Sequence, residues 1–339
     1  MVKETDHILI ARTDSIGDVV LTLPLAASIR KLLPGCRISF IGRTYTADLI
    51  RCCHAVDAFV NWDEASSQGA DLLRSLQATA IIHALPDAEL MRAAHAAGIP
   101  VRIATAGRWA SWKYANHRVW FSRKRSDLHE SQLNHSLLKP LGLVHTPALA
   151  EIAGLYQLTP RAELPAFASA LLHDSFIKVI LHPLSKGSAV NWGLDDFMAL
   201  CHLLPADRFR IFISGTEAEG LRIRPSIPAA LPHVIDMTGK LNLGEFITFI
   251  GKCDALVAAS TGPLHISAAL GLRAIGLYSP ERPIHPGRWA PVGLRAEVIT
   301  ADAHPEAGHT LAISPARVAR SLLVFSEEKE AQSRGKQRS

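Results

Sequence analysis

Residues 7–24, HILIARTDSIGDVVLTLP, join an apolar run to a turn with a glycine and then to a helical pattern. The apolar run at residues 7–11 predicts a strand that is buried on both faces, as is typical of a parallel sheet. The helical pattern continues through Leu33 and stops at Pro34-Gly35, because proline and glycine commonly end a helix. This strand, turn and helix predict the beginning of a βαβ fold.

The same alternation repeats along the chain. Further strands are predicted at residues 37–42, 58–62, 80–85 and 101–104, residues 105–128 are expected to be irregular, and residues 129–141 read as a helix. After a segment rich in Pro, Gly and Thr at residues 142–165, strands recur at 178–182, 209–214, 234–237, 255–259 and 274–278, and a last helix is predicted at 314–325. We therefore expect an α/β protein with two Rossmann-like parallel-sheet domains facing a central cleft: residues 1–160, residues 161–326, and a charged, disordered tail at 327–339.

The composition limits the classes of function. The chain has 339 residues, of which 48% are hydrophobic, and a net charge of +5 that suits a phosphorylated substrate, an anionic lipid or a nucleic acid. The basic run Arg123-Lys124-Arg125 is either a solvated surface or a face that attracts phosphate. Five cysteines without a CxxC pair favour a reduced, cytoplasmic protein. No signal peptide is expected, and no apolar run reaches the roughly 20 residues of a spanning helix, so any membrane contact would be peripheral.

The turn after the first predicted strand, RTDSIGD at residues 12–18, contains a candidate catalytic carboxylate. Gly17 permits a tight turn, and backbone amides at the start of a helix can face a ligand. Asp18 is a candidate for accepting a proton from an attacking hydroxyl, or it serves only to cap the helix and favour its dipole. The turn is not a GxGxxG sequence, so a nicotinamide dinucleotide site is disfavoured.

Three turns of the second half suit a phosphorylated ligand. Residues 260–265, STGPLH, follow a strand and begin a helix, so they form either a diphosphate site or an ordinary capped helix. Ser185 and Lys186 lie in a loop that suits phosphate oxygens or is simply solvated. Glu219 follows another strand, where a carboxylate commonly holds ribose hydroxyls or stabilises a helix start. The histidines and cysteines show no zinc spacing, so neither a metal nor a cofactor is expected.

Taken together, these segments resemble the ADP-heptose lipopolysaccharide heptosyltransferases of glycosyltransferase family 9. Residues 8–24 resemble the opening motif of the family, with Gly17-Asp18 and Pro24 in register, and residues 261–271 resemble its donor motif. His129-Glu130, Asn134 and residues 138–142 resemble the segment before the family's linker, and residues 239–243, GKLNL, match a loop near the adenine.

The resemblance implies a GT-B fold and an inverting transfer of a heptose or related sugar, without a metal, from an ADP-sugar to a lipopolysaccharide core or similar surface glycan. The implied partners are ADP-heptose and an anionic glycolipid, not nucleic acid, and the implied location is the cytoplasm, with peripheral contact at the inner membrane. Asp18 is then the general base, and Arg12, Ser15 and Gly17 bind the acceptor. The implied donor site comprises Ser185, Lys186, Glu219, Leu241, Ser260, Thr261, Gly262, Pro263 and His265.

Two positions depart from the family pattern. Many members have Asp where this chain has Ser260, and many have Lys where it has Val190, two residues before Trp192. Lys186 is a candidate to replace that lysine. The departures leave open the identity of the donor sugar and two alternatives, a nucleotide-sugar 2-epimerase of GT-B-like build and a non-catalytic relative that only binds nucleotide sugars.

Overall fold

The structure is a computed structural model that describes residues 6–65, 68–185, 187, 189–302 and 310–336. It divides into two compact units, unit 1 with Met1–Arg161 and Val292–Leu294, and unit 2 with Ala162–Pro291 and Arg295–Ser339. Each unit contains one six-stranded sheet.

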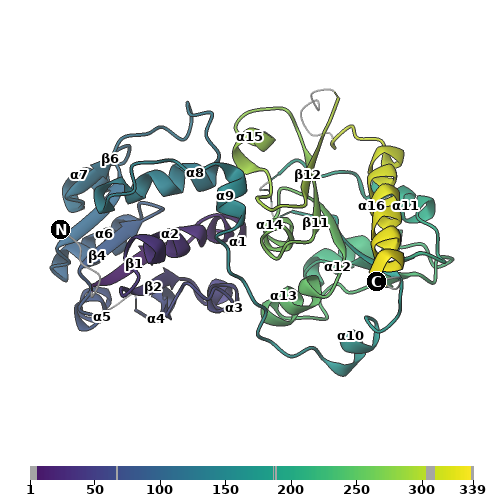
Figure 1. Cartoon of the computed structure of the whole chain (residues 1–339), viewed down its shortest axis with the longest axis horizontal. Helices are drawn as coiled ribbons and strands as arrows, with labels where there is room; N and C mark the ends of the chain where they lie inside the picture. Colours follow the sequence, from purple (N-terminus) through teal and green to yellow (C-terminus); the bar gives the residue numbers. More distant parts are fainter. Residues whose placement is uncertain (1–5, 66–67, 186, 188, 303–309, 337–339) are drawn as a thin grey trace. The chain divides into compact units, whose positions relative to one another are not determined.

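Unit 1 is built on a parallel sheet with the strand order β3-β2-β1-β4-β5-β6 (Figure 1). Its strands are β1 His7–Ala11, β2 Arg37–Gly42, β3 Ala58–Asn61, β4 Ala80–His83, β5 Val101–Thr105 and β6 His117–Val119. Its α-helices are α1 Ile16–Val20, α2 Pro24–Leu32, α3 Ala47–Arg51, α4 Trp62–Ala65, α5 Gly69–Ser75, α6 Ala88–Ala96, α7 Trp109–Tyr114, α8 Glu130–His135 and α9 Leu149–Ala153. Short 3₁₀ helices are η1 Thr44–Thr46 and η2 Ser136–Leu141.

Unit 2 repeats this plan with the strand order β12-β11-β10-β7-β8-β9, again all parallel. Its strands are β7 Ile177–His182, β8 Phe209–Ile213, β9 Val234–Asp236, β10 Ala255–Ala259, β11 Arg273–Tyr278 and β12 Ala296–Thr300. Its helices are α10 Ala166–Ala170, α11 Leu194–Leu203, α12 Glu217–Ile223, η3 Arg224–Ser226, α13 Leu243–Gly251, α14 Gly262–Ala269, α15 Pro286–Trp289 and α16 Pro315–Lys336. The prediction of an α/β fold with two parallel sheets is confirmed.

The strand orders give each unit a topological switch point. In unit 1 the chain turns from β1 to β2 on one side and returns to β4 on the other, so the sheet reverses between β1 and β4. In unit 2 the corresponding reversal lies between β7 and β10. Ligands of open parallel sheets bind beyond the carboxyl ends of the strands at such points. The turn after β1 and the turns after β7 and β10 therefore hold the positions where this fold binds ligands.

Helix α7, strands β6 and β12, and the end of helix α16 differ from the sequence-based expectation. The segment 105–128, expected to be irregular, contains helix α7 and strand β6, and strand β12 was not predicted. The prediction of a disordered tail from residue 327 is wrong up to Lys336, because α16 continues to that residue. Its Glu, Lys, Ala and Gln residues are good helix formers, and Lys329 pairs with Asp254 while Glu330 lies 3.1 Å from Arg208.

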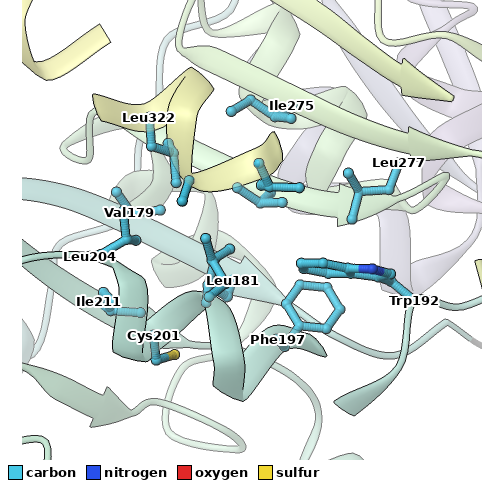
Figure 2. Close-up of a cluster of buried hydrophobic side chains, with 14 of the residues drawn as sticks. Val179, Leu181, Trp192, Phe197, Cys201, Leu204, Ile211, Ile275, Leu277 and Leu322 are labelled. Carbon is cyan, nitrogen blue, oxygen red and sulfur yellow. The ribbon is translucent and has the colours of Figure 1, made fainter. Parts of the chain in front are cut away.

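One apolar cluster of unit 2 joins side chains of its sheet to side chains of helices α11 and α16. Figure 2 shows Trp192 beside Phe197, and their rings meet edge to face with centroids 4.7 Å apart. The indole N–H of Trp192 donates to the carbonyl of Ile313 at 2.9 Å, so the polar atom of this buried side chain is satisfied. Trp192 thereby ties the loop after β7 to the segment that leads into α16.

Trp192→Ala is expected to destabilise the protein strongly, because it leaves a cavity and an unpaired carbonyl in this core. The expected loss is about 3–5 kcal/mol in the free energy of unfolding. Trp109→Ala is the matched control, since Trp109 is 69% exposed. Urea unfolding of both variants checks the prediction, and equal losses for the two variants would contradict it.

Candidate functional site

The turn after β1 is held by Ser15. Its φ and ψ of −63° and 156° place it at the N-cap of α1, and its hydroxyl oxygen accepts from the amide of Asp18 at 3.5 Å. The Ser15 hydroxyl also donates to Asp18 Oδ2 at 2.5 Å. Ser15 therefore caps the helix, and Asp18 stands in the first turn with its carboxylate held by side chains rather than serving as the cap.

Arg12 lies at the centre of a cluster of carboxylates. Its guanidinium is 4% exposed and donates to both oxygens of Asp14, at 2.5 and 2.9 Å, and to Asp18 Oδ1. A third carboxylate, Glu130 of α8, lies 3.4 Å from Arg12 Nη1. A buried guanidinium requires such partners, because removing a charge from water without compensation is costly.

Glu130 and Arg123 are parts of this cluster that the sequence did not connect to the turn after β1; Arg123 was considered only as part of a basic run and Glu130 only as part of a family-like motif. Glu130 has 0% exposure and accepts from Arg123 Nε at 2.9 Å. Arg123 also donates to the carbonyl of Ala84, just after β4, at 2.9 Å. The motif His129-Glu130 with Asn134 signals this arrangement in the sequence, but only the fold brings it to the turn after β1.

The electrostatics of the cluster favour a proton-accepting Asp18. Burial raises the pKa of Asp18 above its ordinary value of 3.8, and the neighbouring Asp14 and Glu130 act in the same direction, against the attraction of Arg12. Burial alone would lower the pKa of the Arg12 guanidinium, but attraction by Asp18, Asp14 and Glu130 raises it overall, so Arg12 remains charged. A carboxylate with a raised pKa is a stronger base than an ordinary aspartate.

In unit 2, the turn between β10 and α14 presents groups that can bind an anion. Thr261 is the N-cap of α14 but its side chain makes no capping hydrogen bond. Its hydroxyl is buried and has no hydrogen-bond partner among the described residues. Gly262 and Pro263 begin the helix, and His265 in the same first turn is buried. A buried hydroxyl at a helix N-terminus lacks only an acceptor, which a phosphate oxygen could provide.

The turns after β7 and β8 lie beside this one, because β7 pairs with β10 on one side and with β8 on the other. His182 ends β7, and its Nδ1 lies 3.0 Å from the hydroxyl of Ser214. Burial lowers the pKa of His182 to about 4, so its imidazole is neutral at physiological pH. Neither His182 nor Ser214 was identified as a site residue from the sequence, since each is a single polar residue at the end of an apolar run.

Glu219 occupies the third position of α12 in a capping box. Its Oε2 accepts from the amide and the hydroxyl of Thr216 at 2.7 and 2.9 Å. The alternative of a helix-stabilising acid is thus realised, and the same geometry fixes the carboxylate at the carboxyl end of β8.

The loop that contains Leu241 is hydrogen-bonded to the loop after β8. The amide of Gly239 donates to the carbonyl of Gly215 at 2.9 Å, and Gly239 has a φ of +71°, which favours glycine. A Cβ atom at Gly239 would also lie 2.1 Å from the carboxylate of Glu217. Leu241 follows as a half-buried side chain directly before the N-cap Asn242 of α13.

The remaining predicted donor residues lie in the same loops. Ser185 donates to Asn191 Oδ1 at 2.8 Å, and Ser260 is half-buried after β10. Val190 packs against the apolar core, whereas Lys186 lies outside the described residues. The structure therefore brings Arg12, Ser15, Gly17 and Asp18 together in unit 1, and it gathers the described donor candidates at one edge of the sheet in unit 2.

None of the helices in the described residues combines the length and hydropathy of a membrane-spanning segment. Within the same part of the chain, no group of three or more His, Cys, Asp and Glu side chains is arranged to hold a metal ion.

Comparison with known proteins gives a consistent result. A family model described as glycosyltransferase family 9 (heptosyltransferase) matches residues 88–312. A protein of Haemophilus influenzae, named as a candidate glycosyltransferase, is 26% identical over 301 residues, which cover 85% of this chain and 86% of that protein.

Solved heptosyltransferases share the fold at low sequence identity. ADP-heptose LPS heptosyltransferase II of E. coli superposes with a TM-score of 0.74 and 17% identity, over 96% of this chain and 100% of that one. E. coli heptosyltransferase WaaC, solved with ADP, gives a TM-score of 0.70 and 18% identity, over 94% and 99% of the two chains. The GT-B fold class expected from the sequence is confirmed by these matches.

The raised pKa of Asp18 predicts how stability depends on pH. A carboxyl with a higher pKa in the folded state binds more protons there, so the free energy of unfolding falls as the pH rises from 3.8 through the folded-state pKa. Asp18→Asn removes this titration. We therefore expect the stability of Asp18→Asn, relative to the wild type, to increase as the pH rises through this window, as measured by urea unfolding at a series of pH values.

Asp63→Asn is the control with the opposite sign. Hydrogen bonds from Arg43 and from the amide of Thr44 lower the pKa of Asp63, so its contribution to stability is present at high pH and is lost as the pH falls. The relative stability of Asp63→Asn should consequently decrease as the pH rises. The same trend in both variants would refute the assignment for Asp18.

Proposed function

The chain belongs to glycosyltransferase family 9, and we propose that it transfers a heptose or a related sugar, with inversion, from an ADP-sugar to a lipopolysaccharide core or similar surface glycan. The observation that carries the proposal is the carboxylate of Asp18, which is held in place by Arg12 and Ser15 at the switch point of unit 1. The membership of a glycosyltransferase family favours sugar transfer over the epimerase considered above.

Asp18 acts as the general base in this proposal. The acceptor hydroxyl loses its proton to Asp18 as its oxygen forms a bond to the anomeric carbon of the donor. The bond between that carbon and the diphosphate oxygen breaks at the same time, and ADP leaves with the electron pair. Each carboxylate oxygen has two lone pairs, so Asp18 can accept this proton while it remains bound to Arg12 and Ser15.

The other residues of the turn orient the acceptor and the base. Ser15 and Arg12 hold the two carboxylate oxygens of Asp18, which restricts the direction from which the hydroxyl approaches. Gly17 leaves room for a sugar ring beside the carboxylate. On this basis unit 1 binds the acceptor through Arg12, Ser15 and Gly17.

Unit 2 binds the donor. We assign the diphosphate to the N-terminal turn of α14, from Ser260 to Pro263, with the buried His265 behind it, because Thr261 has an unsatisfied buried hydroxyl there. Ser185 and Lys186 contribute from the loop after β7. Glu219 binds the ribose, and Leu241 packs on the adenine.

The related proteins support an ADP-sugar as the donor and a lipopolysaccharide precursor as the acceptor. The names of the two E. coli proteins specify ADP-heptose, LPS and bound ADP. An anionic lipopolysaccharide precursor also suits the net charge of +5. Such a precursor places the reaction at the cytoplasmic face of the inner membrane.

Asp18→Asn is expected to lower kcat by about 10²–10⁴-fold, the usual contribution of a positioned base. The dissociation constant of the ADP-sugar should remain near that of the wild type, because Asp18 belongs to the acceptor half. Steady-state transfer assays combined with donor titration test both expectations. Near-normal turnover in Asp18→Asn would exclude the mechanism.

Asp14→Asn is the matched control, since Asp14 pairs with the same arginine. It should reduce kcat less than Asp18→Asn does. The negative charge of Asp14 contributes to the raised pKa of Asp18, so its removal should move the acid limb of the kcat profile to lower pH. An unshifted acid limb would show that Asp18 is not the titrating base.

Thr261→Val tests the diphosphate site. The change removes a buried, unpaired hydroxyl at nearly constant volume, so the melting temperature without ligand should stay the same or rise. The affinity for ADP should fall by about tenfold, which corresponds to a charge-assisted hydrogen bond of about 1.5 kcal/mol. Calorimetry with ADP and thermal unfolding measure the two effects.

Thr238→Val is the control for this experiment. The Thr238 hydroxyl is buried and donates to Asp236 Oδ1 at 2.6 Å, so its loss should lower the melting temperature. A Thr261→Val variant that loses stability and keeps its affinity for ADP would place the diphosphate elsewhere.

A further inference from the structure

Unit 1 exposes a cluster of tryptophans that the proposed transfer does not use. We call the surface formed by α7, β6 and residues 120–125 the indole surface. Trp109, Trp112 and Trp120 are 69%, 53% and 74% exposed, whereas Trp62 and Trp192 are each 1% exposed. Tryptophan is highly buried in most proteins, so three exposed indoles within twelve residues are unusual.

The indoles are arranged together rather than scattered. The rings of Trp112 and Trp120 meet edge to face with centroids 5.6 Å apart, which connects α7 to the segment after β6. Trp109 and Trp112 are three residues apart on α7 and therefore lie on the same side of the helix. The opposite side of α7 is buried through Ala110 and Ser111. Figure 1 shows α7 and β6 next to each other in unit 1.

Cations surround these rings. The Lys113 ammonium lies 5.3 Å from the centre of the Trp109 ring, and the Arg118 guanidinium lies 4.8 Å from that of Trp112. Lys124 and Arg125 of this surface are also exposed, and so is Arg108, the residue directly before α7. No Asp or Glu occurs in the sequence between Glu89 and Asp127, so this stretch of chain is positively charged throughout.

The backbone beneath the indole surface is held firmly. Strand β6 pairs in register with β5, and Arg102 of β5 donates to the carbonyl of Tyr114, at the end of α7, at 2.7 Å. Asn116 both accepts from the amide of Arg102 at 2.8 Å and donates to the carbonyl of Pro100 at 2.7 Å. The exposed indoles therefore project from an ordered base.

We propose that the indole surface docks the protein on a bilayer that contains anionic phospholipids. Indole rings favour the headgroup region, where their apolar part leaves water and their N–H remains hydrated. Lys and Arg beside them are attracted to anionic headgroups near the surface. Protein interfaces are also enriched in Trp and Arg, but their cores are depleted in charged residues, so a surface that carries Lys113 and Lys124 beside its arginines matches anionic headgroups better. The proposal does not depend on the identity of the donor or the acceptor.

Sedimentation of the full-length protein with vesicles tests the proposal. The protein should sediment with vesicles of phosphatidylcholine mixed with phosphatidylglycerol, and much less with phosphatidylcholine alone. The binding should weaken as salt is added, because exposed charges are screened over about 8–10 Å. Lipids brominated on their acyl chains should quench part of the tryptophan fluorescence, which reports insertion of the indoles.

Two double variants separate the aromatic and the ionic contributions. Trp112→Ser with Trp120→Ser should reduce the quenching strongly, with Trp109 as the remaining exposed indole of this surface, and should lower the partition coefficient. Lys124→Gln with Arg125→Gln should lower it by roughly tenfold or more on anionic vesicles, since two cations are lost. Melting temperatures near that of the wild type are expected for both, because the changed side chains are exposed.

Matched controls remove similar groups from other surfaces. Val144 and Leu221 are 77% and 69% exposed, so Val144→Ser with Leu221→Ser removes exposed apolar area elsewhere. Arg222→Gln with Lys252→Gln removes two exposed cations from unit 2. Both control variants should bind vesicles like the wild type.

The proposal is overturned if the wild type does not bind anionic vesicles, or if it binds neutral and anionic vesicles equally. It is also overturned if the variants of the indole surface bind as well as the wild type, or if the controls lose binding to the same degree. Retention on a lipid-free phosphorylated core oligosaccharide without binding to vesicles would assign the surface to glycan recognition instead.

Discussion

Arg12 carries a permanent positive charge at a position that is almost inaccessible to water, and the turn after β1 is organised around that charge. Asp14 and Asp18 reach it from the same turn, and Glu130 reaches it from a helix more than one hundred residues later in the chain. Because one guanidinium faces three carboxylates, negative charge is in excess around Arg12, and Arg123 offsets part of that excess through Glu130. Burial is the main cause of the raised pKa of Asp18, and the negative charges of Asp14 and Glu130 add to it against the attraction of Arg12.

The two units position their ligand-binding turns with the same strand order. In each sheet the strand order reverses beside the first strand of the unit. The turn after this strand therefore lies at the topological switch point, beyond the carboxyl ends of the strands. The units then differ in chemistry. Unit 1 fills the position with a network of charges, whereas unit 2 presents a helix N-terminus, a buried threonine hydroxyl and a neutral histidine. A charged network suits proton transfer, and uncharged donors suit a ligand that itself carries the negative charge.

Val190, which stands where many family members have lysine, has a structural role in this chain. Val190 packs against the apolar core that Trp192 and Phe197 dominate, so the position contributes to stability in this chain. A lysine there would have to extend its amine away from the core. In the proposed mechanism, the charge that many family members place at this position has to come from another residue of the same loop, and Lys186 is the cation available in its sequence.

Local pattern determined much of the fold. Ten of the strands were predicted because they are short apolar runs bounded by turns, and the turns at Gly17 and Gly262 were identified because glycine, capping residues and a following helix occur together in the chain. Strands β6 and β12 were missed because each is a partly exposed edge strand, and its pairing with a neighbour rather than its own hydropathy makes it a strand. The same reason explains α16, which extends to Lys336 because Lys329 and Glu330 pair with residues that are distant in sequence.

The sequence alone also indicated Asp18 and the turn that contains it. Only the tertiary structure decided that Glu130 and Arg123 complete the cluster and that the hydroxyl of Thr261 is buried without a partner. Burial and charge balance depend on groups that approach one another in space, and no spacing along the chain records that approach.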